Sequence, residues 1–417
     1  MKRIYLCIDL KTFYASVECV ERGLDPFKTD LVVADASRGK GTICLAISPK
    51  MKERGIHNRC RFYEIPEGIN PVVAKPRMKK YIEYSAWIYS IYLKYVSKDD
   101  IHVYSIDECF LDITTYLKLY KKEPIDIAKM IIDDVYKTTG ITATAGIGTN
   151  LYLTKIALDI TAKHVDSHIG YLDEEKYKED LWHHKPLTDF WQIGRGISKR
   201  LERLGIHDMY DIAHADPKIL YKEFGVNAEL LIDHANGIEP CTISDIKNYK
   251  SQGHSLSNTQ VLFHDYDKDS AKKVLTEMID SLVLELVAKK KKTNHIWFYI
   301  GYSNDRDKPV SESRKLSNPT SSFNKILSFI ISDYDHHVKT NSMIRRIGVS
   351  FSISTSTNIQ EDLFSNKTIE EDDTKLEETV LNIKKKYGNN SILRAVSYTE
   401  NATARERNKL IGGHNAE

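Results

Sequence analysis

Two adjacent carboxylates interrupt an apolar stretch at residues 104–113, which read YSIDECFLDI. Asp107 and Glu108 would repel each other by about 4 kcal/mol if they were held roughly 4 Å apart at an effective dielectric near 20. In a regular strand neighbouring side chains point to opposite faces, so the two can share one cavity only where a turn or bulge breaks the alternation. We therefore expect two strands that meet at a tight turn near the acidic pair.

A third carboxylate ends another apolar run. The stretch RIYLCIDL, residues 3–10, predicts a buried strand that ends at Asp9. If this strand neighbours those around Asp107 and Glu108, three carboxylates meet at one edge of a sheet. Oxygen ligands of this kind suit Mg²⁺, and two such ions about 3.5 to 4 Å apart can clamp the attacking and leaving oxygens of a phosphoryl transfer. A solvated acidic hairpin tip is the alternative, and we expect Asp112 to be a surface group.

Other chemistries fit these residues less well. A glycosidase pairs carboxylates about 5 Å or more apart on opposite sides of a sugar, which adjacent residues do poorly. The stretch RGKGT, residues 38–42, lacks the spacing of a phosphate-binding P-loop. The six cysteines are scattered, with no C-x-x-C pair, so the sequence predicts neither a disulfide framework nor a zinc site.

Length, hydropathy and charge set further limits. A chain of 417 residues with 41% hydrophobic content is long enough for roughly two to four domains. No stretch approaches the roughly 20 apolar residues of a membrane span, and Asp9 interrupts the first apolar run before the core of a signal peptide could form. We therefore expect a cytoplasmic protein without a membrane partner. Residues 243–356 carry 17 Lys and Arg against 12 Asp and Glu, so this region can face an anion.

The pattern of residues changes along the chain. Up to about residue 167, apolar runs alternate with segments of helical spacing, which describes one α/β domain with an insertion after its first strand. Residues 168–240 are short and helical, and residues 241–249 are polar and could be a linker. Residues 250–356 combine strands with helices in an α+β module. Residues 356–375 are polar, and we expect them to be unfolded.

Four motifs occur in order along the chain: IDLKTFYASVE, YSIDECFLDI, GIGTNLYLTKIALDITAK and QIGRGISKRLERLGI. In this combination the chain resembles the Y-family of translesion DNA polymerases, and most closely the UmuC-like branch of Gram-positive bacteria and their mobile elements. The resemblance covers nearly the whole chain. It implies a multidomain α/β and α+β fold, the right hand of a Y-family polymerase. It also implies a template-directed, low-fidelity enzyme that adds dNTPs to a primer 3′ end in DNA damage tolerance and SOS-type mutagenesis.

The resemblance also implies a division into domains. Residues 1–10 and 78–167 would form the palm, 11–77 the fingers, 168–240 a helical thumb with a helix-hairpin-helix, 241–249 a linker, 250–356 the little finger, and 357–417 a C-terminal tail.

The same resemblance implies roles for individual residues. Asp9, Asp107 and Glu108 would be catalytic and would hold two Mg²⁺ ions, with the backbone carbonyl of Leu10 as a further ligand. Tyr14 matches the steric gate, whose ring favours deoxynucleotides over ribonucleotides. The remaining nucleotide contacts would be Phe13, Ser48, Lys52 and Lys163.

The sequence departs from better-known members of this family at two positions. Pro49 stands where many relatives have a phosphate-binding tyrosine, which leaves Ser48 and the helix N-terminus as the expected phosphate contacts. Lys11 follows the first strand where other members often carry a polar or acidic residue. From the residues alone, Phe13 and Tyr14 could instead be core aromatics, and the lysines of the nucleotide site could be solvated surface charges.

The thumb and the little finger would hold the primer–template DNA. In the stretch IGRGI, residues 193–197, Gly194 and Gly196 would let backbone N–H groups approach a DNA phosphate. An ordinary glycine turn between helices is the alternative. Arg345 and Arg346 are further expected DNA contacts. Binding through phosphates should weaken steeply with salt, which suits a polymerase that must accept any template.

The stretch QEDLF, residues 360–364, resembles the short peptide by which bacterial polymerases dock on the sliding clamp, their β subunit. Gln360, Leu363 and Phe364 would make this contact. A UmuD-like partner is left open. The alternatives to a polymerase are a catalytically idle DNA- or clamp-binding factor and a nucleotidyl cyclase, which shares the palm chemistry but needs no DNA.

Overall fold

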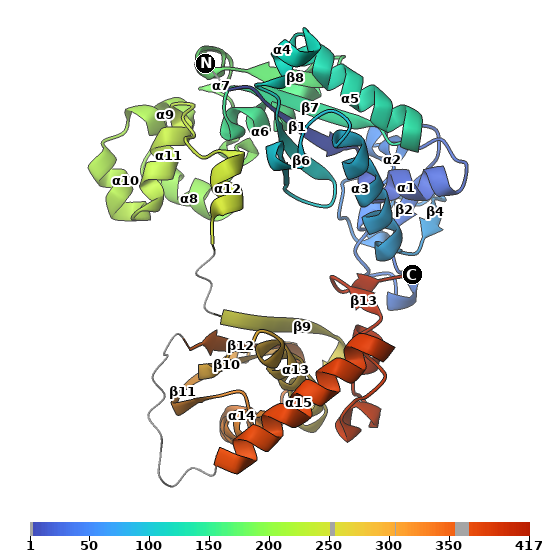
Figure 1. Ribbon diagram of the computed structural model, residues 1–417, viewed down its shortest axis with the longest axis vertical. Helices are drawn as coiled ribbons and strands as arrows, with labels where there is room; N and C mark the ends of the chain where they lie inside the picture. The colour runs from blue at the N-terminus through green and yellow to red at the C-terminus, as the bar shows by residue number, and fades with distance from the viewer. Residues whose placement is uncertain (1–2, 251–254, 305, 355–366) are drawn as a thin grey trace. The chain divides into compact units, whose positions relative to one another are not determined.

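The chain divides into two compact units, residues 1–250 with 415–417 and residues 251–414. The computed structural model describes residues 3–250, 255–304, 306–354 and 367–417 (Figure 1). The expected clamp-binding peptide, residues 360–364, lies outside the described residues.

A five-stranded sheet forms the centre of the first unit (Figure 1). Its strands, in spatial order, are β5 (Ile101–Val103), β6 (Glu108–Asp112), β1 (Tyr5–Leu10), β7 (Ala143–Gly148) and β8 (Ile169–Leu172). The central strand β1 runs antiparallel to both of its neighbours. Leu6, Cys7 and Ile8 are fully buried, so both faces of β1 are covered. The expected pair of strands around the acidic residues is confirmed, because β5 and β6 pair antiparallel.

Helices of the same unit accompany this sheet. They are α3 (Met78–Tyr92), α4 (Tyr116–Tyr120), α5 (Pro124–Thr139) and α6 (Leu151–Asp159). Helix α6 contacts β1, β7 and β8, and α5 contacts β7. The approach of α6 requires glycine in β7, because a Cβ added at Gly146 would lie 2.2 Å from the carbonyl oxygen of Thr154.

The segment between β1 and α3 forms a small module of its own. Its sheet has the order β3 (Ala46–Ile47), β2 (Leu31–Val33) and β4 (Val72–Ala74). Helices α1 (Phe13–Glu21) and α2 (Pro49–Glu53) accompany it. Val32, Ile47 and Met51 form its core with other buried side chains.

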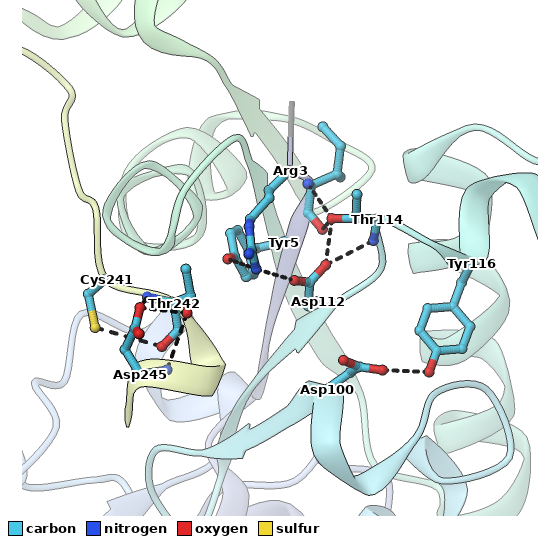
Figure 2. A network of polar contacts seen from close by, with 10 residues as sticks. Arg3, Tyr5, Asp100, Asp112, Thr114, Tyr116, Cys241, Thr242 and Asp245 are labelled. Atoms are coloured by element: carbon cyan, nitrogen blue, oxygen red, sulfur yellow. Dashed lines mark hydrogen bonds and ion pairs between the residues drawn. The ribbon is translucent and has the colours of Figure 1, made fainter. Parts of the chain in front are cut away.

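The rest of the first unit is helical. Its helices are α7 (Glu174–Leu181), α8 (Arg195–Arg203), α9 (Met209–His214), α10 (Pro217–Phe224), α11 (Asn227–Ala235) and α12 (Ile243–Asn248). Helix α12 lies in the segment that we expected to be a polar linker. It starts with a capping box, in which Thr242 and Asp245 bond each other's backbone N–H groups (Figure 2), and its Ile243 is buried beside Tyr5 and Cys7.

The second unit holds a four-stranded antiparallel sheet. Its order is β11 (Val310–Thr320), β10 (Thr293–Tyr302), β12 (Ile344–Ile353) and β9 (Ser255–Tyr266). Helices α13 (Lys268–Ala288) and α14 (Phe323–His337) pack on it through one apolar core. The last elements are α15 (Lys367–Tyr387), α16 (Ala404–Arg407), β13 (Leu410–Ile411) and β14 (His414–Asn415).

The expectation that residues 356–375 are unfolded is wrong for the part that the structure describes. Residues 367–375 begin helix α15, which contacts α13. The chain beyond α15 also packs on α13, because the buried carboxylate of Glu277 accepts hydrogen bonds from the backbone N–H groups of Thr403 and Ala404, at 2.8 and 3.0 Å. Composition alone does not separate a polar helix of this kind from an unfolded segment.

All six cysteines are free thiols. Among the described residues, no helix is both long enough and apolar enough to cross a membrane.

The close contact of α6 with β7 can be tested by adding one methyl group. We expect Gly146→Ala to lower the free energy of unfolding by about 3 kcal/mol, because the new Cβ collides with helix backbone that cannot yield locally. Urea unfolding followed by circular dichroism measures the effect. Gly41→Ala is the matched control: nothing lies within 4 Å of its Cβ position, so we expect a change below about 0.5 kcal/mol. Equal effects would contradict this packing.

Candidate active site

The register of β1 and β6 brings the three predicted carboxylates to the same end of the sheet. Asp9 pairs directly with Glu108, and the backbone N–H of Leu10 donates to the carbonyl oxygen of Asp107 at 3.0 Å. The convergence expected from the sequence is therefore present, although more than 90 residues separate Asp9 from the other two.

A tight turn explains how two adjacent carboxylates can belong to one site. The backbone N–H groups of Tyr104 and Ser105 both donate to the carbonyl oxygen of Glu108, at 3.0 and 3.1 Å. The hydroxyl of Ser105 donates to Oδ1 of Asp107 at 2.6 Å. These bonds interrupt the strand just before β6, so the alternation of side chains breaks where the acidic pair requires it. Asp107 is half-buried and Glu108 is buried.

Lys155 on α6 forms a buried ion pair with Glu108. Its Nζ lies 2.5 Å from Oε1 of Glu108 and 3.0 Å from Oδ1 of Asp159. The thiol of Cys7 also donates to Oε1 of Glu108, at 3.3 Å. Lys155 is not among the site residues expected from the sequence. The available signal was a lysine in the middle of a helix whose other residues are almost all apolar.

The charge of the carboxylates is only partly balanced. The pKa of Asp9 rises to about 7, first because the group is buried and then because the negative charges of Asp107 and Glu108 disfavour its ionised form. The ammonium of Lys155 acts in the opposite direction. An oxygen-only donor set with excess negative charge fits a hard divalent cation.

As the side chains lie, no group of three or more His, Cys, Asp or Glu residues within the described part of the chain has the geometry to hold a metal ion. Glu108 is engaged by Lys155 and Cys7 instead. Both of these contacts fall on Oε1, so an ion can be bound through the other carboxylate oxygen.

Three lysines gather beside the carboxylates. Lys11 follows β1, Lys52 lies at the end of α2, and Lys163 follows α6. The pKa of Lys52 is lowered first by partial burial and further by the charge of Lys163, whereas Asp9 opposes the shift. The pKa of Lys11 is lowered by burial and then by Lys52. Cations that repel each other in this way favour binding of an anion. Lys11, whose role the sequence left open, belongs to this lysine cluster.

A strained turn places two aromatic residues next to the carboxylates. Between β1 and α1 the chain passes through Thr12 at φ 46°, an uncommon conformation for a β-branched residue. Phe13 is buried. The ring of Tyr14 stacks on Tyr81 of α3 with centroids 4.3 Å apart and 15° between the planes. Burial and then the negative charge of Asp107 raise the pKa of Tyr14, so the phenol lies within electrostatic range of the acidic cluster.

Ser48 has a structural position that disfavours the role we expected for it. Its side chain is fully buried. The hydroxyl donates to the carbonyl oxygen of Thr29 at 2.7 Å and accepts from the N–H groups of Leu31 and Met51. The hydroxyl of Ser48 therefore already caps the N-terminus of the five-residue helix α2. This arrangement argues against Ser48 and this helix end as phosphate contacts.

The two glycines of the predicted helix-hairpin-helix are exposed, and neither has a positive φ angle. Gly194 is the N-cap of α8, and Gly196 follows in its first turn. A Cβ added at either position would have nothing within 4 Å. Neither internal packing nor backbone conformation therefore explains glycine here, which agrees with the close approach of an external partner.

The two predicted arginines of the second unit differ in their surroundings. Arg345 forms an ion pair with Asp265 at 3.3 Å. Arg346 is exposed and pairs in register with Val261 of β9 and Gly301 of β10. Arg346 is therefore the better placed of the two for a phosphate contact.

Asp112 is not the simple surface group that we expected. Its side chain accepts hydrogen bonds from Arg3 at 3.2 Å and from the backbone N–H of Thr114 at 3.0 Å (Figure 2). It lies at the end of β6 opposite to Glu108, where β6 pairs with Tyr5 of β1. Asp112 thus stabilises the end of β1 and β6 that lies away from Asp9 and Glu108, and it takes no part in the acidic cluster.

The fold and the acidic site define a class of protein. A solved structure of a Y-family DNA polymerase chimera superimposes with a TM-score of 0.63 at 19% identity, covering 86% of this chain and 100% of the chimera. The architecture is therefore that of a Y-family polymerase, and the expected fold class is confirmed.

Sequence relatives give the family. Residues 8–159 match the impB/mucB/samB family, and residues 254–363 match the impB/mucB/samB family C-terminal domain. A Bacillus subtilis (strain 168) protein named UV-damage repair protein UvrX is 33% identical over 417 residues, which cover 98% of this chain and 97% of the relative. DNA polymerase IV 2 of the same strain is 31% identical over 99% of both chains. The chain belongs to the impB/mucB/samB family, the UmuC-like Y-family polymerases, and is a translesion DNA polymerase.

The buried ion pair predicts a large effect of one substitution on stability. We expect Lys155→Met to lower the free energy of unfolding by about 3 to 5 kcal/mol in metal-free buffer, because it leaves the buried carboxylate of Glu108 without its cation. Chemical denaturation in the presence of a chelator measures the change. Lys163→Met, which alters an exposed lysine, should change stability by less than about 0.5 kcal/mol. A similar result for both variants would argue against the ion pair.

Proposed function

We propose that this polymerase uses Asp9, Asp107 and Glu108 to hold two Mg²⁺ ions while it extends a primer. The primer 3′-hydroxyl oxygen bonds to the α-phosphorus of a template-paired dNTP, the bond to the β-phosphate breaks, pyrophosphate leaves, and the hydroxyl proton passes to water. The pairing of Asp9 with Glu108 across β1 and β6 carries the proposal. When bound, the ions supply positive charge to the attacking and leaving oxygens. The carbonyl of Leu10 remains an expected further ligand.

The lysine cluster would hold the triphosphate. Lys11, Lys52 and Lys163 come from three different segments and lie close enough to Asp9 or to one another to shift pKa values. A metal-bound triphosphate would relieve both the repulsion among these lysines and that among the carboxylates. Tyr14 would exclude a ribose 2′-hydroxyl, and its stack on Tyr81 and the influence of Asp107 on its pKa support this role.

The DNA would be held through its phosphates. In the thumb, the exposed backbone at Gly194 and Gly196 would approach one strand. In the second unit, the sheet face opposite to α13 and α14 carries Trp297, Tyr299 and Arg346 among small serine, threonine and glycine residues. The division into palm, fingers, thumb and little finger is part of the proposal, and the boundary between the compact units after Lys250 supports it.

Docking on the sliding clamp is proposed from the sequence QEDLF alone. Gln360, Leu363 and Phe364 would contact the β subunit. The segment links the strand β12 to the helix α15, so both of its ends belong to the second unit.

Removal of the acidic pair tests the metal assignment. We expect Asp107→Ala with Glu108→Ala to reduce primer extension below detection, because the ions would lose two of three carboxylates, and to change DNA affinity less than about threefold. Primer extension and fluorescence anisotropy measure the two properties. Extension at the rate of the unchanged protein would refute the assignment.

The proposed gate predicts a change in sugar selectivity. Tyr14→Ala removes the ring beside the sugar, so we expect ribonucleotide insertion relative to deoxynucleotide insertion to rise by at least about tenfold. Single-nucleotide insertion with matched rNTP and dNTP measures the ratio. Tyr81→Phe keeps the aromatic stack and is the control. Unchanged selectivity in the Tyr14 variant would exclude it as the gate.

Substitutions in the proposed docking peptide should remove stimulation by the clamp and leave the polymerase activity itself intact. Leu363→Ala with Phe364→Ala should abolish stimulation by the bacterial clamp, because apolar anchors dominate binding of a short peptide. Synthesis without the clamp should remain unchanged. Primer extension with and without clamp measures both, and Ser365→Ala is a neighbouring control. Full stimulation of the double variant would remove this segment from consideration.

A further inference from the structure

Trp191, three residues before the first hairpin glycine, connects the thumb with the turn that carries the acidic pair. Its indole Nε1–H donates to the hydroxyl of Tyr104 at 3.1 Å, and the two rings meet edge to face with centroids 5.9 Å apart. The indole also lies 6.3 Å from Phe110 of β6 and stacks on His234 of α11 at 6.4 Å. One side chain thus contacts both the β5–β6 hairpin and the thumb.

Tyr104 is in turn fixed to Glu108. Its backbone N–H donates to the carbonyl oxygen of Glu108 at 3.0 Å, as part of the turn that contains Asp107. Its ring also lies 5.9 Å from Nζ of Lys155, the ammonium that pairs with the Glu108 carboxylate. A displacement of Tyr104 would therefore move both the backbone of Glu108 and the surroundings of its carboxylate.

A cavity of about 250 Å³ adjoins Trp191, lined by residues that include Tyr152, Gln192, Arg200 and His234. The backbone of Gln192, directly after Trp191, has φ 71°, an uncommon conformation outside glycine that persists only where the surroundings enforce it. The indole therefore contacts the acidic hairpin and His234 and also borders a cavity.

We propose that Trp191 is a positioning residue that couples the thumb hairpin to the placement of Glu108 through Tyr104. When DNA binds at Gly194 and Gly196, it moves or fixes the backbone that carries Trp191. The hydrogen bond from Nε1–H of Trp191 to the hydroxyl of Tyr104 then moves or fixes the acidic turn in the same way. The proposal rests on the proposed roles of Glu108 and of the thumb hairpin. It explains why a bulky indole, rather than a small apolar residue, lies at this junction.

The test removes the hydrogen bond from either side while keeping an aromatic ring. In Trp191→Phe and in Tyr104→Phe we expect kcat for single-nucleotide insertion to fall about tenfold, because a small misplacement of a reacting group costs this much. The KM for dNTP and the Kd for primer–template should stay within about twofold of the unchanged protein. The double variant should be no slower than either single variant, because both remove the same interaction.

Trp182→Phe is the matched control. Trp182 also lies in the thumb, and its Nε1–H donates to the carbonyl oxygen of Ala235 at 2.8 Å. It therefore loses one indole hydrogen bond of the same kind, and we expect similar thermal stability for both tryptophan variants but an unchanged kcat for Trp182→Phe. Equal kcat values for the two variants, or a loss that appears only in DNA affinity, would overturn the proposal.

Tryptophan emission gives a readout that is independent of turnover. In DNA-free protein we expect Mg²⁺ with a dNTP to change the emission of the unchanged protein and of Trp182→Phe, but not of Trp191→Phe. A full emission change in Trp191→Phe would contradict the coupling. The variant with Asp107→Ala and Glu108→Ala distinguishes failure of the metal assignment from failure of the coupling through Trp191. If it extends primers normally, the metal assignment fails. If it is inactive and Trp191→Phe behaves like Trp182→Phe, only the coupling fails.

Discussion

The pairing of β1 with β6 is the constraint on which the active site depends. Both strands are buried, and a shift of their register by one residue would turn every side chain to the opposite face. Leu6, Cys7 and Ile8 leave no room for such a shift, because they are packed on both sides of the sheet. The apolar core therefore sets the position of Asp9 opposite Glu108, and hydrophobic burial fixes the register of the strand that ends at the proposed active site.

The candidate site carries unbalanced charge of both signs, negative at the carboxylates and positive at the lysines. The carboxylates carry more negative charge than Lys155 can balance, which raises the pKa of Asp9. The pKa of Lys11 is lowered by burial and then by the charge of Lys52, and the pKa of Lys52 is lowered by burial and by the charge of Lys163. A divalent cation bound to a triphosphate would supply the missing charge of both signs at once. The substrate of a DNA polymerase is such a complex, so family membership and local charge both support the proposed site.

Much of the fold was predictable because its signals are local. Alternation of apolar residues and the turn near Asp107 can be recognised from neighbouring residues alone. The four motifs, in their order along the chain, carried the resemblance that implied the fold class and the family, and both are confirmed. One error arose where polar composition was taken to mean a lack of structure. Residues 367–375 begin helix α15, which contacts the distant helix α13, and a short window of sequence does not contain that partner.

For the site, the sequence by itself determined the types of residue and the segments from which they come: three carboxylates, several lysines, an aromatic pair and a glycine hairpin. Only the tertiary structure decided how they are used. It paired Glu108 with Lys155, committed the hydroxyl of Ser48 to the backbone, and joined Trp191 to Tyr104. The physical reason is that ion pairs and hydrogen bonds act over about 3 Å in space, whereas these partners are 19 to 87 residues apart along the chain.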